Sequence, residues 1–119
     1  MDEAQSISLR NSAQIVDMTS LLQRFEKNFN VRVFSREFEI IFSLFRNGAM
    51  SAGELVADVS ASQAACYIIS KNMVDRGMVV VKKGESDRRQ VIYELDPKVK
   101  EALEFLALIQ SYYIRKFPG

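Results

Sequence analysis

The strongest chemical signal in the sequence is a group of basic residues in one polar stretch. That stretch runs from residue 82 to residue 90 and contains Lys82, Lys83, Arg88 and Arg89. Long cations on a projecting turn can follow DNA phosphates or enter the narrow minor groove. A solvated surface turn has the same composition, so the charges alone leave a DNA contact and a plain turn equally open.

An acidic residue, Asp87, lies two positions before Arg89 in the same stretch. At that spacing its carboxylate can hold the guanidinium of Arg89, or it can brace the turn by accepting backbone N–H groups. We therefore expect Asp87 to fix the position of Arg89.

A second group of candidate contacts lies on a helix predicted over about residues 62–76. Ser62 is of a type that caps the start of a helix, and Gly77 is of a type that ends one. The residues expected to face inward are Cys66, Ile69 and Met73. The residues left for contact with a partner are Gln63, Ala64, Tyr67, Ile68 and Lys71.

These outer residues include several that can contact DNA. Gln63 can bond adenine bidentately, and Ala64 can touch a thymine methyl group. Lys71 suits a guanine edge or a phosphate, and Tyr67 can donate to a phosphate. A core helix with a small polar face would show the same pattern, so the helix by itself does not decide the function.

The sequence offers few residues of the types that enzymes use for catalysis. The chain has no histidine, the commonest metal ligand and the usual general base at neutral pH. Its one cysteine, Cys66, cannot form an internal disulfide and has apolar neighbours typical of a buried position. The sequence contains no glycine-rich phosphate loop and no cluster of metal ligands. We therefore expect no catalytic site, no metal, no cofactor and no enzyme activity.

The distribution of charge also points to the middle of the chain. The formal net charge is only +1, so the whole protein is not a strongly basic body. Residues 60–95, however, hold six Lys and Arg against four Asp and Glu, whereas residues 1–59 hold six against eight. Any surface that faces DNA is therefore expected within residues 60–95.

The elements that would position these residues begin with a long helix predicted over residues 6–29. Its apolar residues recur at alternating spacings of three and four, which gives one stripe along the helix: Ile15, Met18, Leu22, Phe25 and Phe29. The stripe covers only about two heptads, so it can dock on its own domain or on a partner helix. Both assignments stay open.

Two shorter helices precede the helix at 62–76. Ser35 is expected to cap one whose apolar face is Phe38, Ile41, Phe42 and Phe45, and Asn47-Gly48 ends it. Ser51 and Glu54 have the spacing of a capping box and predict a helix over about 52–58, with Leu55 and Val56 turned inward.

From Met78 onward the pattern becomes extended. Residues 78–81 and 91–95 are rich in β-branched residues, which predicts a two-stranded hairpin with residues 82–90 as its long tip. Asp96 and Pro97 then have the types that start a helix. This last helix is expected over residues 97–115.

The last helix is apolar on nearly every side, and a single small core can cover only one face. Its large apolar residues are Leu103, Phe105, Leu106, Leu108, Ile109, Tyr112, Tyr113 and Ile114. We therefore expect a homodimer in which both terminal helices take part.

The predicted fold class is α+β and mostly helical, in a single domain over residues 1–119. Three helices followed by a hairpin form a winged helix-turn-helix over about residues 34–95, flanked by the helices at 6–29 and 97–115 as dimerisation elements. No stretch is apolar for the ~18 residues of a membrane span, and the start Met1-Asp2-Glu3 does not resemble a secretory signal. A cytoplasmic location without membrane contact is expected.

The sequence resembles the MarR-type winged-helix regulators between about residues 34 and 95. The matching residues are Glu54-Leu55, Ser62, the run Asp75-Arg76-Gly77-Met78-Val79, and Asp87-Arg88-Arg89. In that family the chain is a dimer formed by its terminal helices, and a wing arginine reaches the minor groove. The resemblance implies that Arg89 makes the groove contact, that Asp87 braces the wing, and that Ser62, Gln63, Ala64, Tyr67 and Ile68 stand on the recognition helix.

Together, the residues and the resemblance predict a homodimeric DNA-binding transcriptional regulator whose partner is double-stranded DNA. Many members of the family bind small molecules between their domains, and no motif here identifies such an effector. The alternative is a winged helix that binds another protein without sequence-specific DNA binding. The near-neutral net charge and the apolar side chains of Tyr67 and Ile68 favour that alternative.

Overall fold

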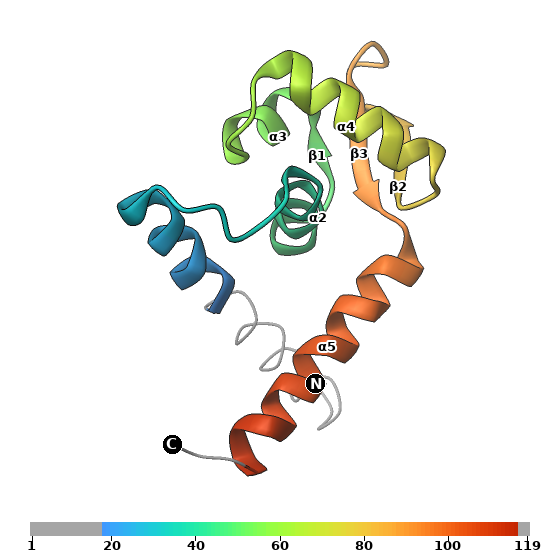
Figure 1. Cartoon of the computed structure of the whole chain (residues 1–119). Helices are drawn as coiled ribbons and strands as arrows, with labels where there is room; N and C mark the ends of the chain where they lie inside the picture. Colours follow the sequence, from blue (N-terminus) through green and yellow to red (C-terminus); the bar gives the residue numbers. More distant parts are fainter. Residues whose placement is uncertain (1–17, 117–119) are drawn as a thin grey trace. The chain divides into compact units, whose positions relative to one another are not determined.

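The computed structural model describes residues 18–116, and it describes the side chains up to residue 108 (Figure 1). A helix covers residues 18–29. The elements that follow are α2 (Arg36–Asn47), β1 (Met50–Ser51), α3 (Ala52–Asp58), α4 (Gln63–Asp75), β2 (Val79–Lys83), β3 (Val91–Leu95) and α5 (Pro97–Lys116). The contacts divide the chain into two compact units: Phe34–Lys100, and the described residues on either side of it.

The predicted winged helix-turn-helix is confirmed in the unit Phe34–Lys100. Ser35 caps α2 by accepting the backbone N–H of Phe38 at 3.0 Å. The helix ends at Gly48, whose φ of 80° favours glycine. Ser51 and Glu54 form the expected capping box at the start of α3.

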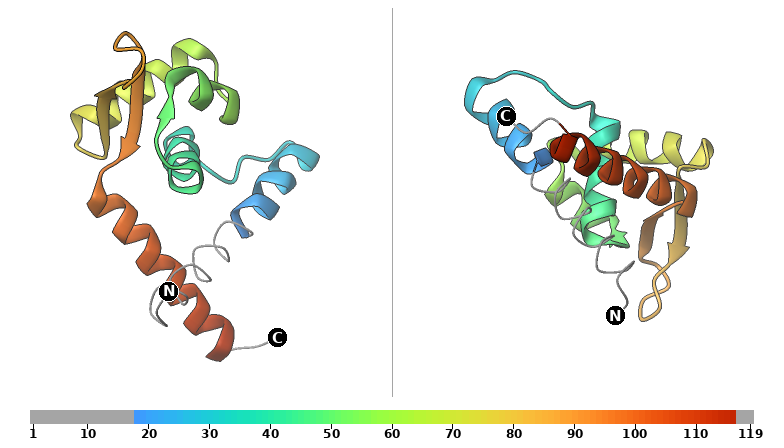
Figure 2. Two further views of the ribbon diagram at one scale, coloured as in Figure 1. Left: turned by 180° about the vertical axis from the view of Figure 1, so that it is seen from behind. Right: turned by 90° about the horizontal axis from the view of Figure 1, so that it is seen from below.

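The sheet has one strand more than the sequence predicted. Met50 and Ser51 form β1, which pairs antiparallel with β3 and gives the strand order β1-β3-β2. The hairpin is therefore part of a three-stranded sheet, with β2 at its edge. Helix α4 lies across one face of the hairpin (Figure 1, Figure 2).

The core of this unit forms between α2, α3, α4 and the sheet. Ile40 and Met73 are completely buried, and Leu55 is 1% exposed. Phe38 and Phe45, expected among the buried residues of α2, are only half-buried, as is Val56 of α3. Ile41 and Phe42 are buried as predicted, and the other buried residues of α2 are Glu39, Ile40, Ser43 and Leu44.

The second unit contains the described parts of the two predicted dimerisation helices. Helix α5 begins in the unit Phe34–Lys100, where Asp96 accepts the N–H of Lys98 at 2.9 Å, and it continues into the second unit from Glu101 onward. Leu103 and Ala107 of α5 are buried, whereas many large apolar side chains of this unit are exposed: Met18, Leu21, Phe25, Phe29, Val31, Val33, Phe105, Leu106 and Leu108. Residues 6–17, Ile15 of the predicted stripe and the side chains after Leu108 lie outside the described residues.

Within residues 18–116, no helix combines the length and the apolar character needed to cross a membrane. The assignment of residues 1–119 to a single domain and the dimerising role of the terminal helices stay predictions.

Candidate nucleic-acid interface

Helix α4 is fixed at both ends by local hydrogen bonds. The Ser62 hydroxyl accepts the N–H of Ala65 at 3.1 Å, so this side chain is already used as the N-cap. At the other end, Gly77 has a φ of 76°, and the N–H of Met78 donates to the carbonyl of Met73 at 2.9 Å. The start and the end of the helix agree with the prediction to within one or two residues.

The outer face of α4 carries the residues that the sequence placed there. The side chains of Gln63, Ala64, Tyr67, Ile68 and Lys71 are all exposed. Tyr67 is 61% and Ile68 66% exposed, so two large apolar surfaces face solvent at the centre of this face. On the inner face, Cys66 and Met73 are buried as expected, but the third buried residue is Ser70 rather than Ile69, which is half-buried.

The turn between α3 and α4 is held to α2 by a buried carboxylate. Glu39 is only 7% exposed, and it accepts a hydrogen bond from the Ser60 hydroxyl at 2.6 Å. Arg36 provides a positive charge to the same carboxylate at 3.4 Å. Because Ser60 lies just before α4, this contact ties the start of that helix to the body of the unit.

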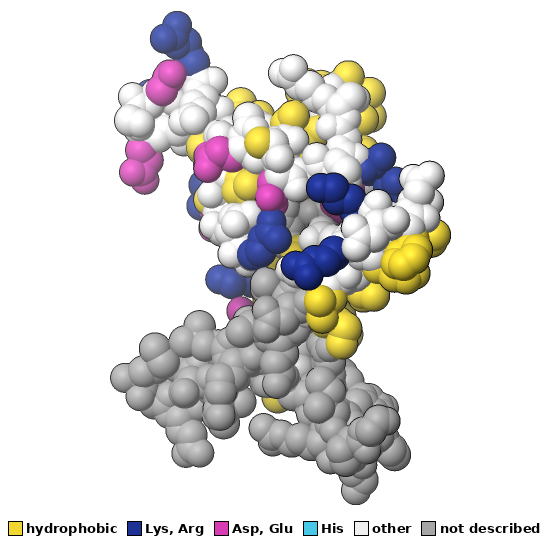
Figure 3. Space-filling view, turned by 90° about the vertical axis from the view of Figure 1, so that its left-hand side faces the viewer, with side chains coloured by type: hydrophobic (Ala, Val, Ile, Leu, Met, Phe, Trp, Pro, Cys, Tyr) yellow, Lys and Arg dark blue, Asp and Glu magenta, His cyan; other side chains and the backbone are white. Residues whose placement is uncertain are grey.

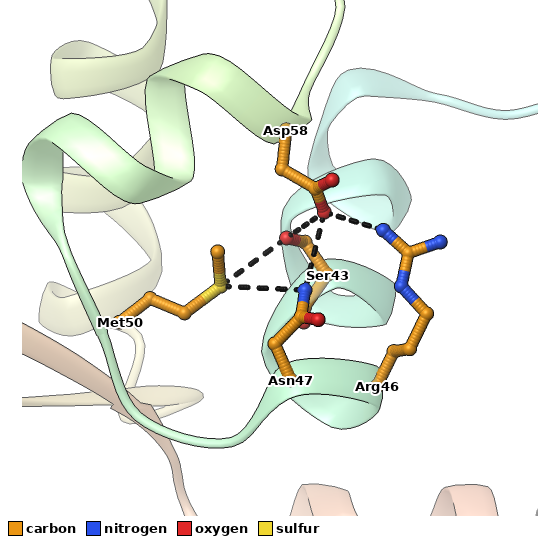
Figure 4. Close-up of polar contacts among 5 residues, drawn as sticks. All are labelled: Ser43, Arg46, Asn47, Met50 and Asp58. Atoms are coloured by element: carbon orange, nitrogen blue, oxygen red, sulfur yellow. Dashed lines mark hydrogen bonds and ion pairs between the residues drawn. The ribbon is translucent and has the colours of Figure 1, made fainter.

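A second carboxylate, Asp58 at the end of α3, joins α3 to the last turns of α2 (Figure 4). Its Oδ2 accepts hydrogen bonds from the Ser43 hydroxyl, from Arg46 at 2.6 Å and from Asn47 at 3.3 Å. No pattern in the sequence predicts this cluster, because its members are separated along the chain and share no motif. The cluster fixes α3 against α2 and so supports the surface on which α4 lies.

The lysines at the end of β2 were predicted to belong to the hairpin tip, but they lie in the strand. Lys82 pairs with Ile92 and Lys83 with Val91 in the antiparallel ladder, so both are strand residues. The Nζ of Lys82 lies 2.7 Å from Oε2 of Glu94 on the adjacent strand. Lysines are favourable on an exposed edge strand because they oppose unwanted pairing, and this accounts for their position here.

The tip itself is the loop 84–90, closed by backbone hydrogen bonds. The N–H of Gly84 donates to the carbonyl of Gln90 at 2.8 Å, and the N–H of Gln90 donates to the carbonyl of Asp87 at 3.0 Å. A Cβ at position 84 would lie 2.5 Å from the Asp87 carbonyl oxygen and 3.1 Å from the Cβ of Gln90. The loop can therefore close in this form only over a glycine.

Asp87 and Arg89 are in the contact that the sequence predicted. The Asp87 carboxylate accepts the backbone N–H of Arg89 at 3.0 Å and lies 3.6 Å from the guanidinium Nε. The Arg89 side chain is otherwise free in solvent, with 95% of its surface exposed. A single carboxylate thus braces the loop and orients the base of a long exposed cation.

The surface around these residues carries charges of both signs. On the face drawn in Figure 3, basic side chains lie close to acidic ones and to scattered hydrophobic ones. Arg76 of the α4 C-cap pairs with Glu37 of α2 at 3.2 Å, as Lys82 does with Glu94. Among the residues described, no group of three His, Cys, Asp or Glu side chains could hold a metal ion.

The sequence of the winged core matches a known protein family. The model of the MarR family matches residues 35–91, which span α2 to the first residue of β3. No curated protein matches the sequence.

Solved structures of several bacterial regulators resemble the chain. BpsR of Bordetella bronchiseptica, whose DNA binding is regulated by 6-hydroxynicotinic acid, is 20% identical, with a TM-score of 0.57 over 93% of this chain and 77% of that one. A mutant MarR from E. coli complexed with operator DNA is 16% identical, with a TM-score of 0.55 over 79% and 73%.

The PcaV transcriptional regulator of Streptomyces coelicolor, in complex with its natural ligand, is 13% identical, with a TM-score of 0.53 over 86% of this chain and 78% of that one. At these identities the structural matches establish the fold, and the family model adds the sequence pattern of the core. Over residues 35–91 the sequence therefore matches the MarR family model, and the fold is that of solved MarR-type winged-helix structures.

Proposed function

We propose that the protein is a transcriptional regulator that binds double-stranded DNA as a homodimer, with α4 in the major groove and the loop 84–90 over the minor groove. The observation that carries this proposal is the placement of Arg89. Asp87 holds its base while the rest of the side chain extends into solvent, and this occurs in a core with the MarR pattern. A free guanidinium on a hairpin tip is suited to the narrow minor groove.

The exposed face of α4 provides the second contact of the proposal. Gln63 and Ala64 lie near its start, where a recognition helix contacts base edges, and Lys71 supplies a cation about two turns later. Ser62 supports this contact chiefly by capping the helix. Lys82, Lys83 and Arg88 are exposed and are assigned to phosphates, since their charge is not tied to one base.

The homodimer is proposed from the exposed apolar side chains of the second unit. Phe29 is 65% exposed, and Phe105, Leu106 and Leu108 are between 49% and 59% exposed. Large apolar side chains gathered on terminal helices are typical of an interface between subunits. Two bound cores would then reach successive major grooves about 34 Å apart.

Selection of bound sequences from a random DNA pool tests the proposal in one experiment. The full chain is expected to enrich a pair of inverted half-sites separated by about one helical turn. Enrichment of a single half-site would contradict the homodimer. No enrichment, with no DNA retarded at low salt, would contradict DNA binding altogether.

A second candidate function is protein binding through the same face of α4. The high exposure of Tyr67 and Ile68 favours it, because an exposed isoleucine contributes little to contacts with DNA. Changing both residues to serine separates the two functions. A regulator of the proposed kind keeps most of its DNA affinity in this variant, whereas a protein-binding module loses its partner.

A further inference from the structure

One row of polar residues on α2 contacts the end of α3 and the turn that follows it. Glu39, Ser43 and Asn47 are spaced by four along α2, so they lie on the same side of the helix. Ser43 and Asn47 both donate to Oδ2 of Asp58 at the end of α3 (Figure 4). The Oε1 of Glu39 accepts the hydroxyl of Ser60 in the turn before α4. Helix α2 is therefore joined to the helix-turn-helix by hydrogen bonds as well as by apolar packing.

Within this row, Glu39 holds the residue that is nearest in sequence to α4. Its carboxylate is only 7% exposed, and both of its oxygens have a partner. Oε1 bonds the Ser60 hydroxyl at 2.6 Å, and Oε2 lies 3.4 Å from Nη1 of Arg36. A buried carboxylate is tolerated only where such partners compensate for its lost hydration. Hydrogen bonds of this kind are directional, so they restrain the position of the turn more narrowly than apolar contacts do.

The other end of α4 is held to α2 less firmly. Arg76, the C-cap of α4, lies 3.2 Å from Glu37 of α2, and about half of each side chain is exposed. Ion pairs at such positions contribute little because water and salt screen them. Of these two polar contacts at the ends of α4, the buried one at Glu39 is therefore the stronger restraint.

We infer that Glu39 is a positioning residue: through Ser60 it fixes where α4 begins relative to α2, and it thereby aligns the first residues of α4 with the DNA bases. The anchoring of α4 depends only on the contacts described above, whereas the alignment with DNA rests on the proposed function. Gln63 and Ala64 are the first two residues of α4, so a shift of the helix start displaces them directly. Contacts to base edges tolerate only small displacements. Losing this anchor should therefore weaken binding to a specific site more than binding to any DNA.

A ratio of two affinities tests the alignment: the affinity for a selected DNA site divided by that for a scrambled duplex of equal length. Glu39→Leu removes the acceptor of the contact, and Ser60→Ala removes the donor. Each variant is expected to lower the ratio about tenfold, while its affinity for scrambled DNA, which depends on phosphate contacts, stays within about twofold of the parent. The double variant should show no further loss, because both changes break the same contact.

Three further variants show whether the contact itself is responsible. Glu39→Gln keeps an oxygen that accepts from Ser60, and Ser60→Thr keeps the hydroxyl. Both should retain the ratio of the parent protein to within about threefold. Val79→Ala weakens the buried start of β2 and leaves both side chains of the contact in place. It should lower the unfolding temperature without changing the ratio, because partial unfolding reduces both affinities equally.

Hydrogen exchange in the free protein tests the anchoring without DNA. The N–H of Ala65 donates to the Ser62 hydroxyl, and the N–H of Cys66 donates to the Ser62 carbonyl. These two amides therefore report on local opening at the start of α4. Both should exchange about fivefold faster in Glu39→Leu and in Ser60→Ala. In Glu39→Gln and Ser60→Thr they should exchange within about twofold of the parent rate.

Each outcome decides one of the two steps. Unchanged exchange in Glu39→Leu and Ser60→Ala would overturn the anchoring. Faster exchange with an unchanged ratio, or an equal fall of the ratio in Val79→Ala, would refute the alignment. A lower ratio in Ser60→Ala but not in Glu39→Leu would mean that Ser60 contacts DNA itself and that Glu39 does not position α4. If the parent protein binds no DNA at low salt, the proposed function and the alignment both fail, and hydrogen exchange still decides the anchoring.

Discussion

The Oδ1 atom of Asp87 accepts the backbone N–H of Arg89 at 3.0 Å and lies 3.6 Å from the Nε of the same residue. The two interactions restrain different parts of Arg89. The first fixes the backbone of the loop, and the second limits the directions that an exposed guanidinium can take. In the proposed function, Asp87 therefore orders the loop at a place where its negative charge would oppose the approach of DNA.

The first prediction follows from this opposition. Asp87→Ala makes the hairpin tip more positive by one charge, which by itself would raise DNA affinity. We expect affinity to fall by about tenfold instead, or about 1.4 kcal/mol, because Arg89 loses its fixed position. Fluorescence anisotropy with a selected DNA site measures the change.

The Arg89→Ala variant serves as the control for this prediction. Arg89→Ala is expected to weaken binding and to reduce the salt slope by about one. Adding Asp87→Ala to it should cause no further loss. If Asp87→Ala alone tightened binding, the carboxylate would act only through its charge, and the bracing role would be wrong. If removing both Arg88 and Arg89 left the affinity and its salt slope unchanged, the hairpin tip would have no part in DNA binding.

A second prediction separates the two roles assigned to Ser62. Its hydroxyl caps α4, so Ser62→Ala should lower the free energy of unfolding by about 1 kcal/mol in urea denaturation. Ser62→Asp keeps the cap and places a favourable negative charge at the helix start, so its stability should match the parent protein. If position 62 faces a phosphate, the same aspartate lowers DNA affinity. A Ser62→Asp variant with unchanged affinity would leave Ser62 with the capping role alone.

A third prediction concerns the Asp58 cluster that joins α2 and α3. Asp58→Ala removes the common acceptor of Ser43, Arg46 and Asn47, and Ser43 is 2% exposed. The free energy of unfolding should fall by about 2 kcal/mol, since a buried donor loses its charged partner. Arg46→Ala alone should cost less because that ion pair is partly exposed. An equal loss in the free energy of unfolding for Asp58→Ala and Arg46→Ala would contradict the role of Asp58 as the shared acceptor of the cluster.

A fourth prediction is a pH dependence at the start of α3. Hydrogen bonds from the backbone and the side chain of Ser51 lower the pKa of Glu54. A carboxyl whose pKa is lower in the folded state stabilises the fold above its unfolded pKa, and this contribution disappears as the pH falls through the folded value. Glu54→Gln keeps a capping box without the charge. The free energies of unfolding of the parent protein and of Glu54→Gln should converge as the pH falls from neutral to acid. A difference that stays constant with pH would exclude the Glu54 carboxylate as the source of the pH dependence.

A fifth prediction tests the homodimer. Leu106 is 52% exposed on α5, so Leu106→Glu should leave the fold intact. It should convert a dimer into a monomer in sedimentation velocity, because an interface core does not tolerate an unpaired charge. Lys100→Glu, at an exposed position near the start of α5, is the control and should remain dimeric. A parent protein that is monomeric at micromolar concentration would contradict the proposed assembly.

The sequence predicted the helices of the winged core because each has a local signal at its ends. Ser35, Ser51, Ser62 and Gly77 mark helix boundaries by chemistry that acts within three or four residues. The apolar pattern and these caps agreed, and the structure follows them closely.

The features that the sequence did not predict depend on contacts between distant residues. Strand β1 has only two residues, and one of them, Ser51, carries the stronger signal of a helix cap. Lys82 and Lys83 looked like loop residues, yet they continue β2 because Ile92 and Val91 stand opposite them. The burial of Ser70 and the cluster around Asp58 depend on how α2, α3 and α4 pack, which no local pattern specifies.

The glycine at position 84 has a consequence for the way this loop can vary. Its lack of a side chain, together with the backbone bonds to Gln90, determines the path of the loop. The shape of the tip is therefore encoded separately from its charge. In the proposed function, exposed positions such as Glu85 and Ser86 can therefore vary to suit a different DNA sequence while the loop backbone that presents Arg89 stays the same. Within the seven residues 84–90, the residues that determine the path of the loop are therefore different from those available for contact with DNA in the proposed function.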